Sequence, residues 1–306
     1  MLDLAIAVVG SISLDVVVPV PQLPMPGQAV LGGGQSRHHG GKGANQAVAA
    51  TRLGSSVAMV GRVGADESGP ALAEALASDG VDITHVTVTE GVPTGRALIA
   101  IDPDGENTVI ITPGGNGLLS PADCEAAGDV ISAARVTLLQ QEVSYETNTM
   151  AAHLASGLVL LNPAPVRVGQ STLPENVDVL LPGRSELAGL LGLAPDRLAD
   201  FDDVVRAARG VRGPGALVVS LGSEGTVLIE GTTSKLIPPF AVDSVDMLAV
   251  ADCFCGAIAC TLAEGQTLEN AAVFALAASA ISATRVGSRT SLPSRAEVEQ
   301  FLTTHS

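Results

Sequence analysis

Apolar, β-branched runs alternate with helix-like segments along most of this chain, and this alternation limits the possible folds more than any other feature. The apolar runs lie at 4–9, 57–60, 136–139, 158–161, 177–181, 216–220 and 226–229. Segments with helical apolar spacing lie at 43–53, 68–78, 121–133, 146–156, 202–211, 253–263, 268–284 and 294–302. Strands that alternate with helices form a mostly parallel sheet with helices on both faces. We therefore predict an α/β fold.

Four short strand-like segments do not fit this alternation. They lie at 15–20, 29–36, 96–101 and 107–112. The last two flank Pro103-Asp104-Gly105, which is a hairpin turn signal. We expect these strands to form a small separate sheet that acts as a lid. The chain has no low-complexity linker or long charge run, so we predict a single domain over 1–306, with lid strands from about 15–36 and 96–112.

Composition limits the partners of the chain. Hydrophobic residues make up 46% of its 306 residues, which excludes a disordered chain. The net charge of −16 argues against nucleic acid as a partner. Of the four cysteines, Cys253, Cys255 and Cys260 fall in one apolar helical segment, which predicts buried thiols and a reducing compartment. We see neither a signal peptide nor an apolar run of about 18 residues, and we expect a cytoplasmic protein with no membrane partner.

A glycine-rich turn precedes the first predicted helix. Its sequence is His39-Gly40-Gly41-Lys42-Gly43-Ala44-Asn45. Glycines allow close approach of a ligand, and the free N–H groups at a helix start can bind an oxygen-rich one. Lys42 and Asn45 would add donors from the same side. An ordinary glycine turn before a structural helix explains the spacing equally well. The stretch lacks the spacing of a P-loop.

Two acidic residues stand where ligands commonly bind. Asp252 begins the apolar helix over 253–263, where the helix dipole stabilises a carboxylate. It is either a helix cap or a base that takes a proton from a substrate hydroxyl. Asp15 follows the first strand, at the edge of the sheet where ligands bind in parallel folds. It either stabilises a turn or accepts hydrogen bonds from two sugar hydroxyls.

Several motifs, in the same order, resemble those of ribokinases, within the wider carbohydrate kinase family named after the minor phosphofructokinase. The matching stretches are Gly10-Ser11-Ile12 with Asp15, 40–47, 162–165, 221–225 and 284–291. The likeness spans nearly the whole chain. It implies a ribokinase-like three-layer α/β sandwich with a central, mostly parallel sheet and a β lid, through which two chains often form a homodimer.

The resemblance also implies a reaction and its residues. The enzyme would phosphorylate a hydroxymethyl group of a small sugar with ATP, most simply ribose to ribose 5-phosphate, with Asp252 as the base. The sugar would contact Ser13, Asp15, Gly41, Lys42, Asn45 and Glu142. ATP, with Mg²⁺ on its phosphates, would lie near Gly183, Glu186, Ser220, Gly222, Gly225, Ala249, Val250 and Ala251. A monovalent cation, usually K⁺, would lie near Asp246, Leu248, Ser282, Gly287 and Ser291.

The sequence departs from the family pattern at these same places. Ala249 and Ala251 replace two glycines before the base, Met247 replaces a threonine, and Gly183 and Ser13 replace asparagines. If the backbone needs a positive φ at Ala251, its β-carbon would introduce strain. A relative that binds a sugar or nucleoside without efficient transfer is therefore the alternative. Deoxyribose, another pentose or a nucleoside stay open as substrates. A Rossmann dehydrogenase is disfavoured, because no Gly-x-Gly-x-x-Gly follows the first strand.

Overall fold

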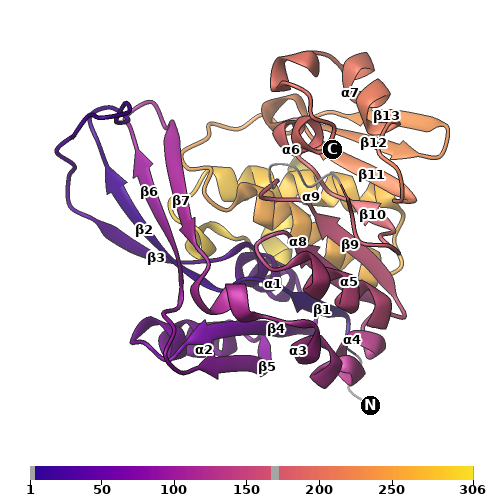
Figure 1. Ribbon diagram of the computed structural model, residues 1–306. Helices are drawn as coiled ribbons and strands as arrows, with labels where there is room; N and C mark the ends of the chain where they lie inside the picture. The colour runs from indigo at the N-terminus through magenta and orange to yellow at the C-terminus, as the bar shows by residue number, and fades with distance from the viewer. Residues whose placement is uncertain (1–3, 167–171, 306) are drawn as a thin grey trace.

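Two β-sheets organise the part of the chain that the computed structural model describes, residues 4–166 and 172–305 (Figure 1). In those residues the large sheet has nine strands, in the order β13-β12-β11-β10-β9-β8-β1-β4-β5. Their bounds are β1 Ile6–Val9, β4 Val57–Gly64, β5 Asp82–Thr89, β8 Val136–Gln140, β9 Leu158–Asn162, β10 Val179–Leu180, β11 Ala216–Ser220, β12 Thr226–Glu230 and β13 Thr233–Ile237. Strand β12 pairs antiparallel with both β11 and β13, and the other described strand pairs of this sheet are parallel. The predicted mostly parallel sheet is confirmed.

Helices cover both faces of the large sheet, as the alternation predicts. One layer consists of α1 Lys42–Arg52, α2 Ser68–Ser78, α8 Val250–Ala263, α9 Leu268–Ala283 and α10 Arg295–Thr304. The other consists of α3 Pro121–Ala126, α4 Gly128–Ala133, α5 Tyr145–Leu154, α6 Arg184–Leu190 and α7 Phe201–Ala208. Strand residues alternate between the two cores, with Ile6 in the first and Ala7 in the second. None of the described helices is long and apolar enough to cross a membrane.

The second sheet has the strand order β3-β2-β6-β7 and lies to one side of the first (Figure 1). Its strands are β2 Ser13–Pro19, β3 Ser36–Gly40, β6 Gly95–Ile101 and β7 Asn107–Thr112. Residues 10–12 join the end of β1 directly to β2, so the two sheets meet at the carboxyl end of β1. This junction places β2 and β3 beside the turn that begins α1.

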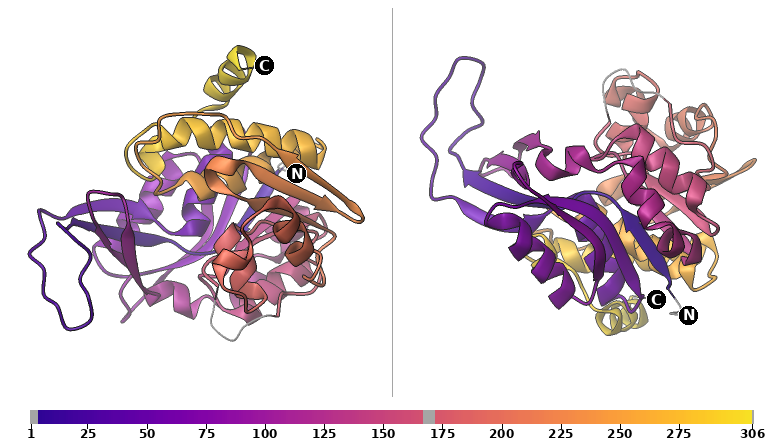
Figure 2. Two further views of the ribbon diagram at one scale, coloured as in Figure 1. Left: turned by 90° about the horizontal axis from the view of Figure 1, so that it is seen from above. Right: turned by 60° about the horizontal axis from the view of Figure 1, so that its bottom comes forward.

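The strand expected over 29–36 is wrong. Figure 2 shows the segment between β2 and β3 as a long loop that extends beyond both sheets. Pairing with β2 begins only at Ser36, opposite Val17. The three consecutive glycines at 32–34 carry no side chains that could pack on a sheet, and their neighbours are exposed.

Smaller differences from the sequence prediction have local causes. The helix expected over 121–133 is interrupted at Ala127, whose φ and ψ of −99° and 14° separate α3 from α4. Strands β5 and β13 and helix α6 escaped prediction. Both strands lie at the edges of the large sheet, and their half-exposed residues lack a continuous apolar run. All four cysteines are buried with free thiols, and their predicted burial is confirmed.

Candidate active site

Asp252 is the third residue of α8 and lies buried at the start of that helix, with 4% of its surface exposed. Each oxygen of its carboxylate accepts a hydrogen bond from α1. Asn45 Nδ2 donates to Oδ2 at 3.0 Å, and Gln46 Nε2 donates to Oδ1 at 3.0 Å. Within the described residues, the carboxylate accepts from these α1 amides and caps no N–H of its own helix, so the simple capping interpretation does not describe it.

The glycine-rich turn wraps closely around the end of β1. Gly41, the residue before α1, has a φ of 87°. A β-carbon on it would lie 2.8 Å from both Ser11 O and Ser13 N, so only glycine fits. Glu142, just after β8, accepts hydrogen bonds from the backbone N of Lys42 at 3.0 Å and from the hydroxyl of Ser11. These contacts tie the start of α1 to the carboxyl ends of β1 and β8.

Asp15 on β2 completes the group. A β-carbon on Gly40, across the strand pair, would come within 2.2 Å of the Asp15 carboxylate oxygens, so glycine leaves the space that this carboxylate fills. Burial, together with the negative charges of Glu142 and Asp252, raises the pKa of Asp15 to about 7. Arg289 and Lys42 lie near enough to oppose that rise. The five predicted residues Asp15, Lys42, Asn45, Glu142 and Asp252 therefore meet in one place.

Lys42 offsets part of the negative charge of this group. Burial raises the pKa of Asp252, and the positive charge of Lys42 opposes the rise. Burial alone would lower the pKa of Lys42, but the carboxylates of Asp252, Glu142 and Glu186 raise it, so the ammonium stays protonated at neutral pH. A carboxylate with a raised pKa beside a fixed cation is suited to accepting a proton at neutral pH.

The residues expected near ATP lie at the carboxyl ends of the neighbouring strands. Gly183, directly before α6, forms a bridge with Ser220 at the end of β11. Gly222 and Gly225 follow with φ values of 63° and 97° in the turn that leads to β12. Glu186 stands in the first turn of α6, within electrostatic reach of Lys42. Ala249, Val250 and Ala251 form the start of α8 beside Asp252.

The residues expected around a monovalent cation are also close together. The two carboxylate oxygens of Asp246 accept from the backbone N–H groups of Leu248 at 2.9 Å and Gly287 at 2.8 Å. The hydroxyls of Ser282 and Ser291 lie 2.9 Å apart. The backbone N of Asp246 donates to Ala283, the residue after Ser282, and so links the two pairs.

Comparisons with known proteins match nearly the whole chain. The model of the pfkB family carbohydrate kinases matches residues 3–295. The chain belongs to the pfkB family of carbohydrate kinases. It is 33% identical to ribokinase of Haemophilus influenzae over 97% of this chain and 98% of that protein. It is 32% identical to deoxyribokinase of Salmonella typhi over 97% of each. A ribokinase structure from Arabidopsis thaliana, complexed with ribose and ATP, matches with a TM-score of 0.87 and 30% identity, covering 98% and 99% of the two chains.

The alanines that replace family glycines do not strain this pfkB-family kinase. Ala249 has a φ of −121°, and Ala251 lies within α8. Among the described residues, Asn176 is the only non-glycine with a positive φ. The strain considered at Ala251 is therefore absent, because the helix begins one turn earlier than the sequence suggested, at Val250.

Sequence reasoning missed several polar residues of this candidate site. Arg289 is 4% exposed, and its Nε donates to Asn45 Oδ1 at 3.3 Å. Gln140, at the end of β8, donates to Gln46 Oε1 at 2.8 Å. Gln46 itself lies inside the glycine-rich motif, next to Asn45, and could have been found from that position. Arg289 and Gln140 gave no signal, because only the fold brings them to α1.

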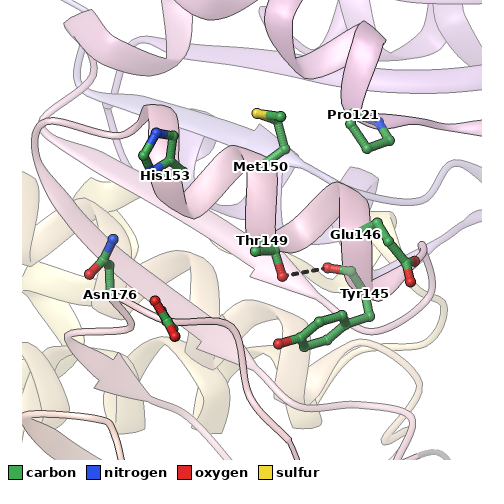
Figure 3. Close-up of a pocket in the computed structure, with 8 residues that line it drawn as sticks. Pro121, Tyr145, Glu146, Thr149, Met150, His153 and Asn176 are labelled. Atoms are coloured by element: carbon green, nitrogen blue, oxygen red, sulfur yellow. Dashed lines mark hydrogen bonds between the residues drawn. The ribbon is translucent and has the colours of Figure 1, made fainter.

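A separate pocket of about 410 Å³ lies outside this group of residues (Figure 3). It is lined by residues of α5 and of the segment before β10, among them Tyr145, His153 and Asn176. Helix α5 packs in the core on the opposite face of the large sheet from α1 and α8. None of the predicted site residues lines the pocket.

Proposed function

We propose that this kinase transfers the γ-phosphoryl group of ATP to the hydroxymethyl group of ribose and so forms ribose 5-phosphate. The observation that carries the proposal is the buried Asp252 carboxylate, held by two amide donors and within the electrostatic influence of the Lys42 ammonium. The ribokinase relatives, one of them complexed with ribose and ATP, support ribose as the acceptor.

The sugar would lie among the acidic and amide groups around the glycine-rich turn. Asp15 and Glu142 offer carboxylate oxygens that can accept hydrogen bonds from sugar hydroxyls. Lys42 and Asn45 can donate hydrogen bonds to the oxygens of those hydroxyls. Gly41 allows the close approach of the sugar, and Ser13 at the start of β2 adds a short hydroxyl donor. The hydroxyl of Ser13 accepts a hydrogen bond from Asn116 Nδ2 at 3.3 Å, and this contact fixes the Ser13 side chain.

Asp252 would act as the general base. Its carboxylate takes the proton of the substrate hydroxyl, the sugar oxygen forms a bond to the γ-phosphorus, and the bond from that phosphorus to the bridging oxygen breaks. The backbone N–H groups at the start of α8, at Ala249, Val250 and Ala251, would stabilise the charge on the transferred group, although that of Val250 also donates to Met247 O at 3.4 Å. ADP leaves with the electron pair of the broken bond.

The nucleotide would lie along the strand ends that lead to this helix. Ser220, Gly222 and Gly225 lie on the turn that leads to β12, where Gly222 is exposed and Gly225 is buried, and Gly183 and Glu186 stand beside it. The described residues contain no group of three or more His, Cys, Asp or Glu side chains arranged for a metal ion. Mg²⁺ would therefore be bound mainly by the ATP phosphates, with Glu186 nearby. The ion would neutralise phosphate charge.

A monovalent cation fits the loops on the far side of the start of α8. Asp246 supplies a carboxylate there, and the carbonyl or hydroxyl oxygens of Leu248, Ser282, Gly287 and Ser291 supply the oxygen ligands that K⁺ prefers. Asp246 already joins the loop before α8 to the loop after α9 through Leu248 N and Gly287 N. A cation bound to the same loops would hold the start of α8 in place.

The second sheet would serve as the lid and as the surface of a homodimer. Leu98 on β6 and Ile110 on β7 pair with each other and so share one face of this sheet, and their exposed fractions of 45% and 59% give an apolar surface that a second chain could cover. Val109 and Ile111, exposed by 46% and 42%, lie on the opposite face. We also place the kinase in the cytoplasm, since its four thiols are free and buried, as a reducing compartment would keep them.

An assay of ADP release tests the proposal. The wild-type chain is incubated with ATP, Mg²⁺ and K⁺ and a panel of ribose, deoxyribose, hexoses and nucleosides, and the phosphorylated product is identified by mass spectrometry. Ribose should give the highest kcat/KM and a single monophosphate. If deoxyribose gives the highest kcat/KM, deoxyribose rather than ribose is the acceptor, as in the relative named deoxyribokinase. If ribose raises the melting temperature but no sugar is turned over, the chain is a sugar-binding relative instead.

A further inference from the structure

The two amides that hold Asp252 are themselves held by two further buried side chains. Asn45 Nδ2 and Gln46 Nε2 donate to the carboxylate, so the carbonyl oxygens of both amides point away from it. Arg289 Nε donates to Asn45 Oδ1 at 3.3 Å. Gln140 Nε2 donates to Gln46 Oε1 at 2.8 Å. Each oxygen of Asp252 thus stands at the end of a two-step chain of donors.

The contacts of Gln46 allow only one orientation of its amide. Its Nε2 faces two acceptors, Asp252 Oδ1 at 3.0 Å and Asn162 Oδ1 at 3.3 Å. Asn162 cannot turn its own amide without losing the bond from its Nδ2 to Leu181 O at 2.8 Å. A reversed Gln46 would direct its oxygen at two oxygens and its nitrogen at the nitrogen of Gln140. The polar side chains of this network are only 0–5% exposed, so water cannot readily replace a lost hydrogen-bond partner.

The backbone leaves room for Gln140 at the end of β8. A β-carbon on Gly10, which follows β1, would lie 2.0 Å from Gln140 Oε1. The Gln140 backbone carbonyl accepts from Asn148 Nδ2 at 2.7 Å, which fixes the strand end from the other side. Neither contact involves a residue proposed to touch the sugar or ATP. Gln140 reaches the proposed reaction only through Gln46 and Asp252.

We propose that Gln140 and Arg289 are positioning residues that orient Gln46 and Asn45 and thereby aim and stabilise the ionised carboxylate of Asp252. The proposal rests on the kinase function above. The two arms differ in what they affect. The Gln140 arm contacts only the base, so its loss should change kcat. The Arg289 arm passes through Asn45, which is proposed to bind the sugar, so its loss should change both kcat and the KM for the sugar.

The test compares Gln140→Met, which removes the donor at similar length, and Gln140→Glu, which keeps the shape but presents an acceptor to Gln46. Thr137→Val is the matched control, because Thr137 is also buried on β8 and its hydroxyl has no partner. Without Gln140, Gln46 can turn its amide away from Asp252. Loss of that donor raises the pKa of the carboxyl, so the acid limb of the kcat profile should move up by about one pH unit in Gln140→Met. At pH values below the acid limb, kcat of Gln140→Met should be about tenfold lower than that of wild type, with the KM for ATP unchanged. Gln140→Glu should be affected more.

A second measurement does not depend on turnover. The pKa of the Asp252 carboxyl is read by ¹³C NMR, with its signal assigned by its loss in Asp252→Asn. Melting temperatures show whether each variant folds. A higher pKa of Asp252 in Gln140→Met than in Thr137→Val supports the proposal, even if the wild-type chain phosphorylates no sugar and the kinase function itself fails. Equal pKa values in folded Gln140→Met and Thr137→Val overturn it.

Discussion

Asn45 and Asp252 stand 207 residues apart in the sequence, yet Asn45 Nδ2 lies 3.0 Å from Asp252 Oδ2. The contact joins the glycine-rich turn at the start of α1 to the start of α8. Two motifs that are separately ambiguous thereby form one site, since a carboxylate held by side-chain amides of another helix is not a simple helix cap.

The raised pKa of Asp15 predicts a pH-dependent cost in stability. The folded-state pKa of about 7 lies above the ordinary value of 3.8, so the folded chain binds the proton more tightly than the unfolded chain. The cost is absent below about pH 4, grows as the pH rises and is complete above about 7. Asp15→Asn should remove it and gain about 2 kcal/mol at pH 8, allowing for solvent screening of this half-buried group.

Thermal melts of Asp15→Asn and wild type from pH 4.5 to 8.5 measure this difference. The variant's melting temperature should exceed that of wild type increasingly as the pH rises. Asp66→Asn is a useful comparison. The hydrogen bonds of Asp66 with Thr94 and Arg96 outweigh the effect of burial and lower the pKa of this carboxyl. Loss of the Asp66 carboxylate should therefore destabilise the chain at neutral pH. A constant difference between Asp15→Asn and wild type at every pH would show that the Asp15 carboxyl does not titrate near 7.

Substitution of Gly41 should disrupt the sugar side of the site. Alanine there would combine a φ of 87° with contacts of 2.8 Å to the backbone of Ser11 and Ser13. We expect Gly41→Ala to lose about 2 kcal/mol or more in unfolding free energy. Ribose binding should fall more than ATP binding in calorimetry.

Two other glycines separate the causes. Gly27 shares the positive φ, at 83°, but has open space around it, so Gly27→Ala should show the backbone strain alone. Gly34 has neither constraint, and Gly34→Ala should leave stability unchanged. If all three variants unfold alike, the close approach at Gly41 is not what requires glycine.

Ala251 should tolerate glycine but not a larger side chain. Its backbone is helical and its methyl group is exposed at the start of α8, where the phosphoryl group is proposed to lie. Ala251→Gly should therefore change kcat by no more than about threefold, because no positive φ has to be relieved. Ala251→Val should lower kcat and the affinity for ATP by about tenfold or more through crowding. A large gain of activity in Ala251→Gly would show that the methyl group obstructs transfer.

The apolar face of the second sheet should hold two chains together. Ile110 on β7 is 59% exposed, so Ile110→Glu would place a charge in the proposed interface. Light scattering after size-exclusion chromatography should show a dimer for wild type and a monomer for this variant. Val88→Glu on β5, 47% exposed at the edge of the large sheet, should stay dimeric. A monomeric wild type would reject the interface.

The parallel sheet was predictable because apolar runs such as 136–139 are buried on both faces and leave a strong signal. The second sheet was harder. Its strand β3 reads Ser-Arg-His-His-Gly, with no apolar residue, and exists because β2 pairs with it and Ser288 and Arg289 bond to its last carbonyls. Asp252 and Lys42 were found because helix starts have a recognisable pattern. Gln140 and Arg289 were not, because their roles arise only from packing between distant segments.

In the proposed reaction, Asp252 removes the proton of the sugar hydroxyl. Single-turnover phosphoryl transfer, measured by rapid quench with ribose and labelled ATP, tests it most directly when wild type and Asp252→Asn are compared at equal saturation. We expect Asp252→Asn to slow the transfer step by about a thousandfold, while calorimetry still detects ribose and ATP binding. A transfer rate within a few-fold of wild type would contradict it.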